Sequence, residues 1–245
     1  MTFDTATLSR PGGREDNEDY CGFHMKDDGK HGGCWVVADG LGGHAGGALA
    51  SRTAVEAALA SYDTNPSGDH VAAAHRAVVA QQNEKLRNEP KLATMRATLV
   101  MLITSAESAT WAHSGDSRLY HFRSGHVVFQ THDHSVPQRL ADAGEIAPDQ
   151  IRFHEDRNRL LRCLGGKPDP GATASEAPVA LEEGDAFLLC TDGFWEYVYE
   201  SEMEQDLVTA QDAKDWLGRM ELRLHARASG ENDNYTAIGV LVHAT

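Results

Sequence analysis

Short blocks of apolar residues alternate along the chain with polar clusters that contain Gly, Asp or Ser. Most of these blocks are rich in β-branched or aromatic side chains, a composition and length typical of β-strands. The predicted strands cover residues 34–38, 97–104, 109–113, 117–122, 126–131, 186–191 and 236–242. The short link that contains Gly125 predicts a β-hairpin between two of them.

Two longer stretches have the periodicity of helices. In residues 46–62 and 69–87, apolar side chains recur at steps of three and four residues, and a third helix is predicted at about 213–228. The strands come in clusters between these helices instead of alternating with them one by one. This order favours an α+β fold with antiparallel sheets over a doubly wound parallel sheet.

The segment 136–166 differs from its surroundings because it is charged and has weak strand character. We interpret it as a small surface flap with a short helix. No internal repeat or long linker divides the 245 residues, so a single domain over 1–245 is the simplest prediction.

The charge and the cysteines narrow the class of protein. The formal net charge of −15 disfavours nucleic acid and anionic membrane as partners. No apolar run approaches the roughly 20 residues of a membrane span, and no secretion signal is visible. The four cysteines form no CxxC pair. We therefore expect a reduced, cytoplasmic protein.

Acidic residues lie at the ends of several predicted strands. They are Glu18 and Asp19, which precede the strand-like residues 20–23, and Asp39, Asp116, Asp192 and Asp233. If these strand ends lie side by side, the carboxylates converge and need a cation to offset their repulsion. Oxygen ligands of this kind suit Mg²⁺ or Mn²⁺, and a bridging carboxylate would hold two ions that activate water. For any single Asp-Gly pair, however, a simple turn is the more common explanation.

Glycines and an arginine accompany these acids. Gly40 and Gly193 directly follow Asp39 and Asp192, where the absence of a side chain would let a metal-bound water or a backbone carbonyl approach. Arg14 lies in a Gly-rich loop just before Glu18, and its guanidinium suits bidentate contact with phosphate oxygens.

Taken in order, these motifs resemble a known family. They are Arg14-x-x-Asn17-Glu18-Asp19, Val37-Ala38-Asp39-Gly40-Leu41-Gly42-Gly43, Gly115-Asp116-Ser117-Arg118, Asp133-His134-Ser135, Leu164-Gly165, Thr191-Asp192-Gly193 and Asp233-Asn234-x-Thr236. The set resembles the bacterial metal-dependent Ser/Thr protein phosphatases of the protein phosphatase 2C-like type. The resemblance covers nearly the whole chain.

The resemblance implies an αββα sandwich of two antiparallel sheets with two Mn²⁺ or Mg²⁺ ions at one edge. Asp39 would bridge the ions, and the Gly40 carbonyl would bind one of them. The other implied ligands are Glu18, Asp19, Asp192 and Asp233, with Asp116 at a third, weaker ion. Arg14 would bind phosphate, and His44 is a candidate for protonating the leaving group. The flap would bear on the choice of substrate.

The implied reaction is hydrolysis of phosphoserine or phosphothreonine in a protein by a metal-activated water, opposing a Ser/Thr kinase. Residues Asp192–Val198 and the acidic stretch that follows resemble phosphatases found with type VI secretion systems. Two other functions stay open. The chain could be an inactive relative that binds phosphoproteins, or it could bind a nucleotide through the loop Gly40–Gly47.

The histidines of the sequence His132-x-His134 could suggest a metal site. We expect His132 to be exposed and His134 to be structural. His113 is expected in the core or behind the site.

Overall fold

The computed structural model describes residues 1–26, 32–42, 45–166 and 171–245. Its first sheet has the strand order β1-β13-β12-β8-β9, and all neighbours are antiparallel. These strands are β1 (Thr2–Arg10), β13 (Tyr235–His243), β12 (Ala186–Cys190), β8 (Arg118–Arg123) and β9 (His126–Gln130).

The second sheet has the order β10-β7-β6-β3-β2, and β11 also pairs with β7. Its strands are β10 (Thr173–Ala174), β7 (Ser108–Ser114), β6 (Leu99–Thr104), β3 (Gly33–Ala38), β2 (Tyr20–Met25) and β11 (Val179–Ala180). A small additional pair joins β4 (Gly40–Leu41) to β5 (Arg96–Ala97).

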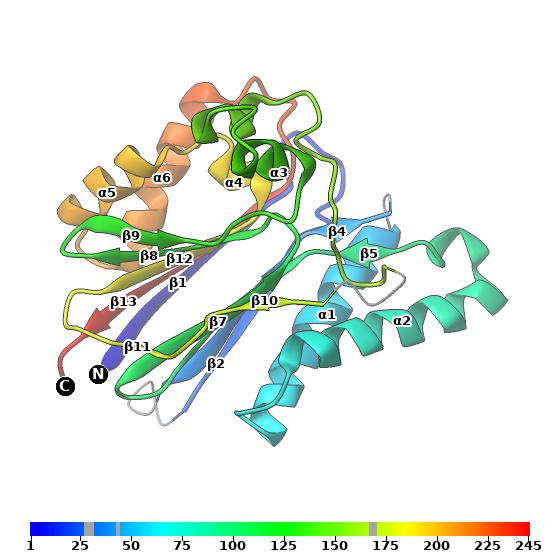
Figure 1. Ribbon diagram of the computed structural model, residues 1–245, viewed down its shortest axis with the longest axis horizontal. Coiled ribbons are helices and arrows are strands. Elements are labelled where there is room, and N and C mark those ends of the chain that lie inside the picture. The colour runs from blue at the N-terminus through cyan, green and yellow to red at the C-terminus, as the bar shows by residue number, and fades with distance from the viewer. Residues whose placement is uncertain (27–31, 43–44, 167–170) are drawn as a thin grey trace.

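Helices cover the outer faces of both sheets (Figure 1). The helices α1 (Ala45–Thr64) and α2 (His70–Asn88) lie on the second sheet. The first sheet is covered by α4 (Asp192–Trp195), α5 (Glu200–Thr209) and α6 (Ala213–Arg227). The remaining short helices are η2 (Pro90–Leu92), α3 (Val136–Asp142) and η3 (Pro148–Phe153). The predicted αββα sandwich is confirmed. No helix of the described residues is long and apolar enough to cross a membrane.

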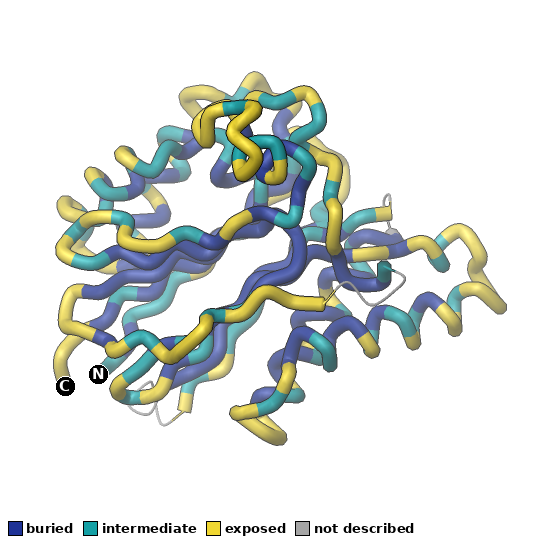
Figure 2. Tube along the Cα trace, in the orientation of Figure 1, coloured by how far each residue is buried: buried dark blue, intermediate teal, exposed yellow. Residues whose placement is uncertain are grey.

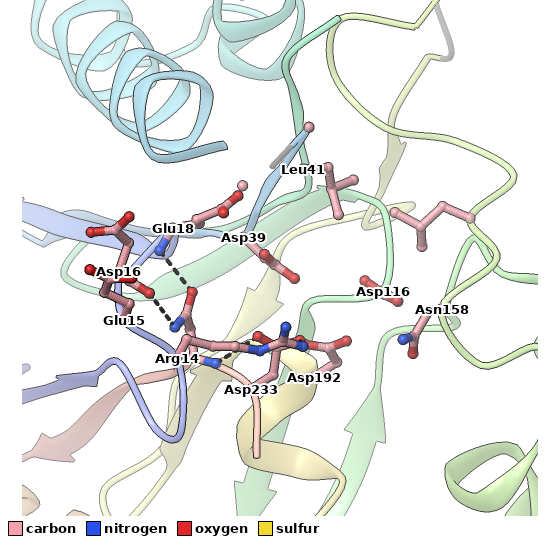
Figure 3. Close-up of a pocket in the computed structure, with 14 residues that line it drawn as sticks. Arg14, Glu15, Asp16, Glu18, Asp39, Leu41, Asp116, Asn158, Asp192 and Asp233 are labelled. Carbon is pink, nitrogen blue, oxygen red and sulfur yellow. Dashed lines mark hydrogen bonds and ion pairs between the residues drawn. The ribbon is translucent and has the colours of Figure 1, made fainter. Parts of the chain in front are cut away.

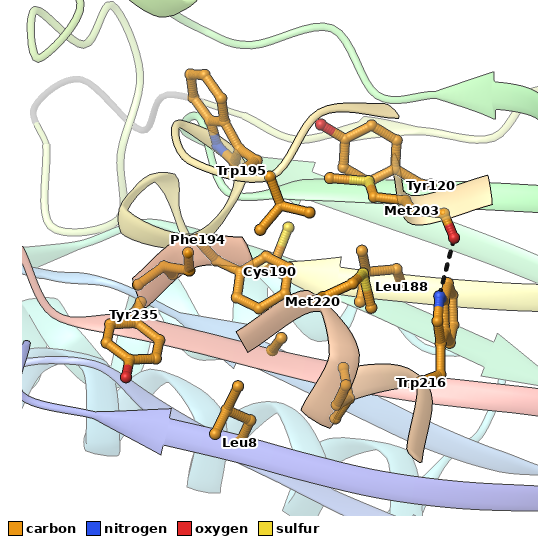
Figure 4. Close-up of a cluster of buried hydrophobic side chains, with 14 of the residues drawn as sticks. Leu8, Tyr120, Leu188, Cys190, Phe194, Trp195, Met203, Trp216, Met220 and Tyr235 are labelled. Atoms are coloured by element: carbon orange, nitrogen blue, oxygen red, sulfur yellow. Dashed lines mark hydrogen bonds between the residues drawn. The ribbon is translucent and has the colours of Figure 1, made fainter. Parts of the chain in front are cut away.

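Three layers of apolar side chains fill the sandwich, and the central strands contribute to two layers each. In β3, Trp35 packs between the sheets, whereas Val36 packs toward α1 and α2. In β12, Phe187 faces the other sheet, whereas Leu188 faces the helices α4–α6 (Figure 4). Strands buried on both faces need apolar side chains at every position. Continuous apolar runs therefore mark the central strands, which lie inside the molecule (Figure 2).

The strand prediction was wrong in several details. The predicted strand 97–104 is interrupted at Thr98, and the predicted strand 126–131 ends at Gln130. Several elements were not predicted from the sequence: β1, the short strands β4, β10 and β11, and the helices α4 and α5. In β1 polar and apolar residues are mixed because the strand lies at the edge of its sheet and has few fully buried positions.

The predicted flap 136–166 contains α3 and η3. Two isolated β-bridges connect it to the rest of the chain, Ser135 with Leu160 and Ala97 with Leu164. The single-domain organisation stays a prediction.

A buried ion pair fixes the base of the flap. The guanidinium of Arg118 donates two hydrogen bonds of 2.8 Å to the two carboxylate oxygens of Asp133. The same guanidinium lies 3.5 Å from the ring centre of Trp195, and its Nη1 donates to the hydroxyl of Tyr120. Both charged side chains are almost completely buried. Both charges are shielded from water, so Asp133 depends on Arg118, and Arg118 depends mainly on Asp133, with Glu200 as a more distant second acid at 3.7 Å.

We expect Asp133→Ala to lower the free energy of unfolding by about 3–5 kcal/mol, because it removes the bidentate partner of a buried guanidinium and leaves it with the more distant Glu200, whose Oε1 lies 3.7 Å from Nη1. Urea unfolding of the purified variant would measure the change. The exposed pair of Arg159 and Asp156 provides the control. Asp156→Ala should cost less than about 1 kcal/mol, and equal losses in the two variants would contradict this account.

Candidate active site

A cavity of about 260 Å³ brings most of the predicted site residues together (Figure 3). The predicted residues that line it are Arg14, Glu18, Asp39, Gly40, Asp116, Asp192 and Asp233. Asp19 is not among the lining residues and is buried. His44 lies outside the described residues. The acids thus meet at one edge of the sandwich, as the sequence predicted.

The register of the strands explains this meeting. Tyr20 pairs with Ala38, so Asp19, which precedes β2, and Asp39, which follows β3, lie at the same end of these neighbouring strands. In the other sheet Cys190 lies opposite Ala237 and Arg118, so Asp192, Asp233 and Asp116 lie near the same end of β12, β13 and β8. Antiparallel pairing therefore places acids that follow some strands beside acids that precede others.

Thr98 holds the backbone of Asp39. The Asp39 N–H donates to Thr98 Oγ1 at 2.9 Å, and the Thr98 N–H donates to the Asp39 carbonyl at 2.8 Å. The Thr98 hydroxyl is also hydrogen-bonded to Ser117, at 2.7 Å, and Ser117 directly follows Asp116. Thr98 occupies the break between β5 and β6. It therefore links the two loops that carry Asp39 and Asp116.

Asn234 holds the loop that carries Arg14. Its side-chain amide donates to the carbonyls of Pro11 and Asp16 at 2.8 and 2.9 Å, and its side-chain oxygen accepts the Glu18 N–H at 2.8 Å. Asn234 belongs to one of the sequence motifs, but no role was predicted for it. Its position directly after Asp233 was the available signal.

The glycines of the site have a packing role that the sequence analysis did not foresee. A β-carbon on Gly40 would overlap the carbonyl oxygen of Gly47 and lie 2.6 Å from that of Glu18. A β-carbon on Gly193 would overlap the carbonyl oxygen of Asn234. Backbone segments thus approach each other closely at both positions, and any larger residue would push the strand ends apart.

Arg14 is the predicted phosphate ligand, and its side chain is 58% exposed. Its Nη2 lies 3.0 Å from Asp233 Oδ2. The guanidinium is therefore at the cavity, with much of its surface open to solvent and to a ligand.

Burial and mutual repulsion raise the pKa of several acids. Burial, opposed by hydrogen bonds and reinforced by repulsion from Asp192 and Asp233, raises the pKa of Asp19 to about 7. Burial and repulsion from Asp233 raise the pKa of Asp192 to about 6. The pKa values of Asp39 and Asp116 are also well above the ordinary range, through burial first and repulsion by neighbouring acids second. The site therefore stores unfavourable electrostatic energy at neutral pH.

The donor atoms ring the cavity instead of surrounding one point. No compact group of three or more His, Cys, Asp or Glu side chains that could hold an ion occurs in the part of the chain that the structure describes. One carboxylate oxygen, Asp19 Oδ1, is nevertheless buried without any hydrogen-bond partner. Oxygen donors, repulsion among the acids and an unsatisfied buried oxygen all fit a hard divalent cation.

Comparison with known proteins shows the family to which the chain belongs. A family model described as Protein phosphatase 2C matches residues 13–233. The chain belongs to the protein phosphatase 2C family.

Two relatives are named as phosphatases. The chain is 32% identical over 207 residues to the serine/threonine protein phosphatase PstP of Mycobacterium tuberculosis, covering 83% of this chain and 39% of that protein. It therefore spans about two fifths of the length of this relative. It is 31% identical over 206 residues to the protein phosphatase PhpP of Streptococcus pneumoniae, covering 80% of each.

Two solved structures are similar over nearly the whole chain. The catalytic domain of PstP in complex with two manganese ions has a TM-score of 0.76 and 30% identity, with 99% of each chain covered. PppA, described as a key regulatory component of the type VI secretion system in Pseudomonas aeruginosa, has a TM-score of 0.74 and 29% identity, with 98% of each chain covered.

In this member of the protein phosphatase 2C family, the flap forms one wall of the cavity. Asn158 and Leu160 line it, with Asn158 close to Asp116 (Figure 3). The neighbouring Arg157 donates to Glu196 at 2.8 Å. Burial, with repulsion from Asp192, raises the pKa of Glu196 to about 7. This ion pair ties the flap to the end of α4.

The histidine predictions agree with the structure. His132 is exposed, whereas His134 accepts the Gly115 N–H and stacks on the buried His113 with ring centres 4.5 Å apart. His113 and His134 therefore support the backbone at Gly115, which directly precedes Asp116.

The raised pKa values predict how stability depends on pH. A carboxyl whose pKa is higher in the folded state contributes stability that is complete below its unfolded value of about 4 and is lost as pH rises through the folded value. For Asp192 and Asp19 those folded values are about 6 and about 7. The protein in EDTA should therefore lose on the order of 4 kcal/mol of unfolding free energy between pH 5 and pH 8 from this source.

Urea unfolding at several pH values would measure this loss. Asp233→Asn removes a charge that repels both Asp19 and Asp192, so the loss should be smaller in that variant, whereas Asp149→Asn on the exposed surface of the flap should leave it unchanged. The same pH dependence in all three proteins would show that the acids of the cavity do not repel one another strongly.

Proposed function

We propose that this chain is a divalent-cation-dependent protein serine/threonine phosphatase. The observation that carries the proposal is the cavity in which Arg14 faces a ring of carboxylates from both sheets (Figure 3). The family and the names of the relatives support the same activity.

The proposed cation ligands are oxygens that line the cavity or lie directly behind it. Asp39 is placed between the Glu18 side and the Asp192 side of the cavity, which suits a carboxylate shared by two ions (Figure 3). Glu18, Asp19, Asp192, Asp233 and the Gly40 carbonyl complete the proposed set, and Asp116 with Asp192 would hold a third, weaker ion. PstP with two manganese ions supports Mn²⁺, and Mg²⁺ has the same preference for oxygen.

The chemistry follows from charge. Bound divalent cations supply a water of lowered pKa and neutralise the charge of a phosphoryl group. Without them the carboxylates would repel a phosphate dianion, and among the described residues that line the cavity only Arg14 would attract it. The chain's own residues fix the carboxylate positions through Thr98 and Asn234, and Arg14 orients the phosphoryl oxygens. The fixed acids would keep the attacking and leaving groups in line.

The proposed substrate is a phosphoprotein, and the opposing enzyme would be a Ser/Thr kinase. The similarity to PppA supports a place in a type VI secretion system. This assignment agrees with the resemblance of residues Asp192–Val198 noted in the sequence.

Nucleotide binding is less well supported. Residues Gly40 and Leu41 form β4, which pairs with β5, so their backbone groups are engaged in a small sheet. Asp63, the acid about 20 residues further on, lies in α1 and not at the end of a second strand. A dinucleotide-binding fingerprint needs free backbone groups in the glycine loop and an acid at the end of a second strand.

Hydrolysis of a phosphothreonine peptide and of p-nitrophenyl phosphate tests the activity. We expect turnover with Mn²⁺ or Mg²⁺ and none in EDTA. Asp39→Asn should lower kcat by about 100-fold or more, because it removes a proposed ligand of the cations that act on the phosphoryl group. Asp149→Asn is the control. A folded protein that binds the phosphopeptide without turnover would support the inactive relative, and turnover that survives EDTA would contradict the proposal.

Arg14 should act on substrate binding. Arg14→Ala is expected to lower kcat/KM for the phosphopeptide by about 10- to 100-fold. Arg14→Lys should have a kcat/KM between those of the unaltered protein and Arg14→Ala, because lysine keeps the charge but not the bidentate geometry. Steady-state kinetics at saturating Mn²⁺ would measure this. Equal kcat/KM values for all three proteins would remove Arg14 from the site.

A further inference from the structure

Thr191 lies directly before Asp192 and is fully buried. Its hydroxyl donates to Asp19 Oδ2 at 2.8 Å and accepts the N–H of Thr236 at 3.0 Å. Its own N–H donates to the carbonyl of Thr236, also at 3.0 Å. One side chain therefore connects the end of β12, the start of β13 and the residue that precedes β2.

The direction of these hydrogen bonds is determined by the backbone. A threonine hydroxyl has a single proton, and an N–H group can only donate. Because the Thr236 N–H takes the acceptor side of the hydroxyl, the proton of Thr191 is available for Asp19. The hydroxyl thus donates to a carboxylate oxygen, which favours the ionised form of that carboxylate.

The other oxygen of the same carboxylate has no partner. Asp19 Oδ1 is buried and accepts no hydrogen bond of good geometry, although the hydroxyl of Thr236 also lies near this carboxylate. A buried polar atom without a partner costs about 1–3 kcal/mol, more when it is charged, so such atoms are rare unless a ligand uses them. Asp19 directly precedes β2, and Asp39 directly follows the neighbouring strand β3. Because Tyr20 pairs with Ala38, the two acids lie at the same end of these strands, next to the cavity.

We propose that Thr191 is a positioning residue that holds Asp19 through Oδ2 and so presents Oδ1 to a divalent cation, directly or through a water. This inference rests on the proposed metal-dependent function. Thr191 does not touch substrate or cation. Its effect is to fix one rotamer of Asp19 before the cation arrives, which lowers the cost of ordering the ligand.

The hydroxyl can be removed with little change in volume. Thr191→Val replaces it by a methyl group, whereas Thr191→Ser keeps the hydroxyl and loses the methyl. Thr131→Val is the matched control, because Thr131 is another buried threonine whose hydroxyl accepts a backbone N–H, that of Leu119, at 3.0 Å. If Thr191→Val does not fold, as judged by circular dichroism, Thr191→Ala takes its place against Thr191→Ser.

Isothermal titration calorimetry with Mn²⁺ alone is the decisive measurement. We expect Thr191→Val to weaken Mn²⁺ binding by about 10- to 100-fold, the effect usual for a group that orients a metal ligand. Thr191→Ser and Thr131→Val should stay within about threefold of the unaltered protein, the loss of a methyl or a remote hydroxyl being small by comparison. In kinetic assays, Thr191→Val should need more Mn²⁺ for half-maximal rate and recover most of kcat when Mn²⁺ saturates.

A double-mutant cycle tests whether the effect passes through Asp19. In an Asp19→Ala background, Thr191→Val should cause no further loss of Mn²⁺ affinity. Unaltered Mn²⁺ affinity in Thr191→Val would overturn the inference, as would a loss that persists fully in the Asp19→Ala background. If the unaltered chain binds no Mn²⁺, the proposed function itself fails, and this outcome is distinguishable from the other two.

Discussion

Face-to-face packing of the two sheets is the constraint on which the rest of the structure depends. Trp35, Phe187 and Ile238 lie in the layer between the sheets, and the alternate residues of the same strands lie under helices. Strands buried on both faces have no position for an unpaired polar side chain. Polar function is therefore displaced to the strand ends, where side chains can reach a cavity.

Gathering the acids at one edge costs electrostatic free energy, because the carboxylates repel one another. The surrounding hydrogen bonds hold the acids in these positions. Asp39, Asp19 and the Glu18 backbone are held by Thr98, Thr191 and Asn234, respectively. These partners do not remove the charge, so the acids stay in repulsive positions with raised pKa values. A fold that keeps carboxylates ready for cations is consequently less stable at neutral pH when no cation is bound.

The sequence allowed the acids to be predicted, because an aspartate that interrupts a long apolar run is visible without a structure. The α+β class with antiparallel sheets also followed from the pattern of strands and helices, whereas the αββα sandwich followed only through the resemblance to a family. The residues that hold the acids could not be found in this way. Thr98, Thr191 and Asn234 act through partners that are 59, 172 and 216 residues distant. A single threonine or asparagine next to a strand is also common in turns that have no such role.

The two exposed walls of the cavity differ from its interior in how firmly they are held. Asp39 and Asp116 are fixed by backbone hydrogen bonds and by the close packing of glycines. Arg14 and Asn158, by contrast, are exposed. Their contacts can change without disturbing the sheets, because neither side chain supports the core. We therefore expect the interior to set the chemistry, since any shift there moves several strand ends together. The flap can then vary to suit the proposed phosphoprotein substrate.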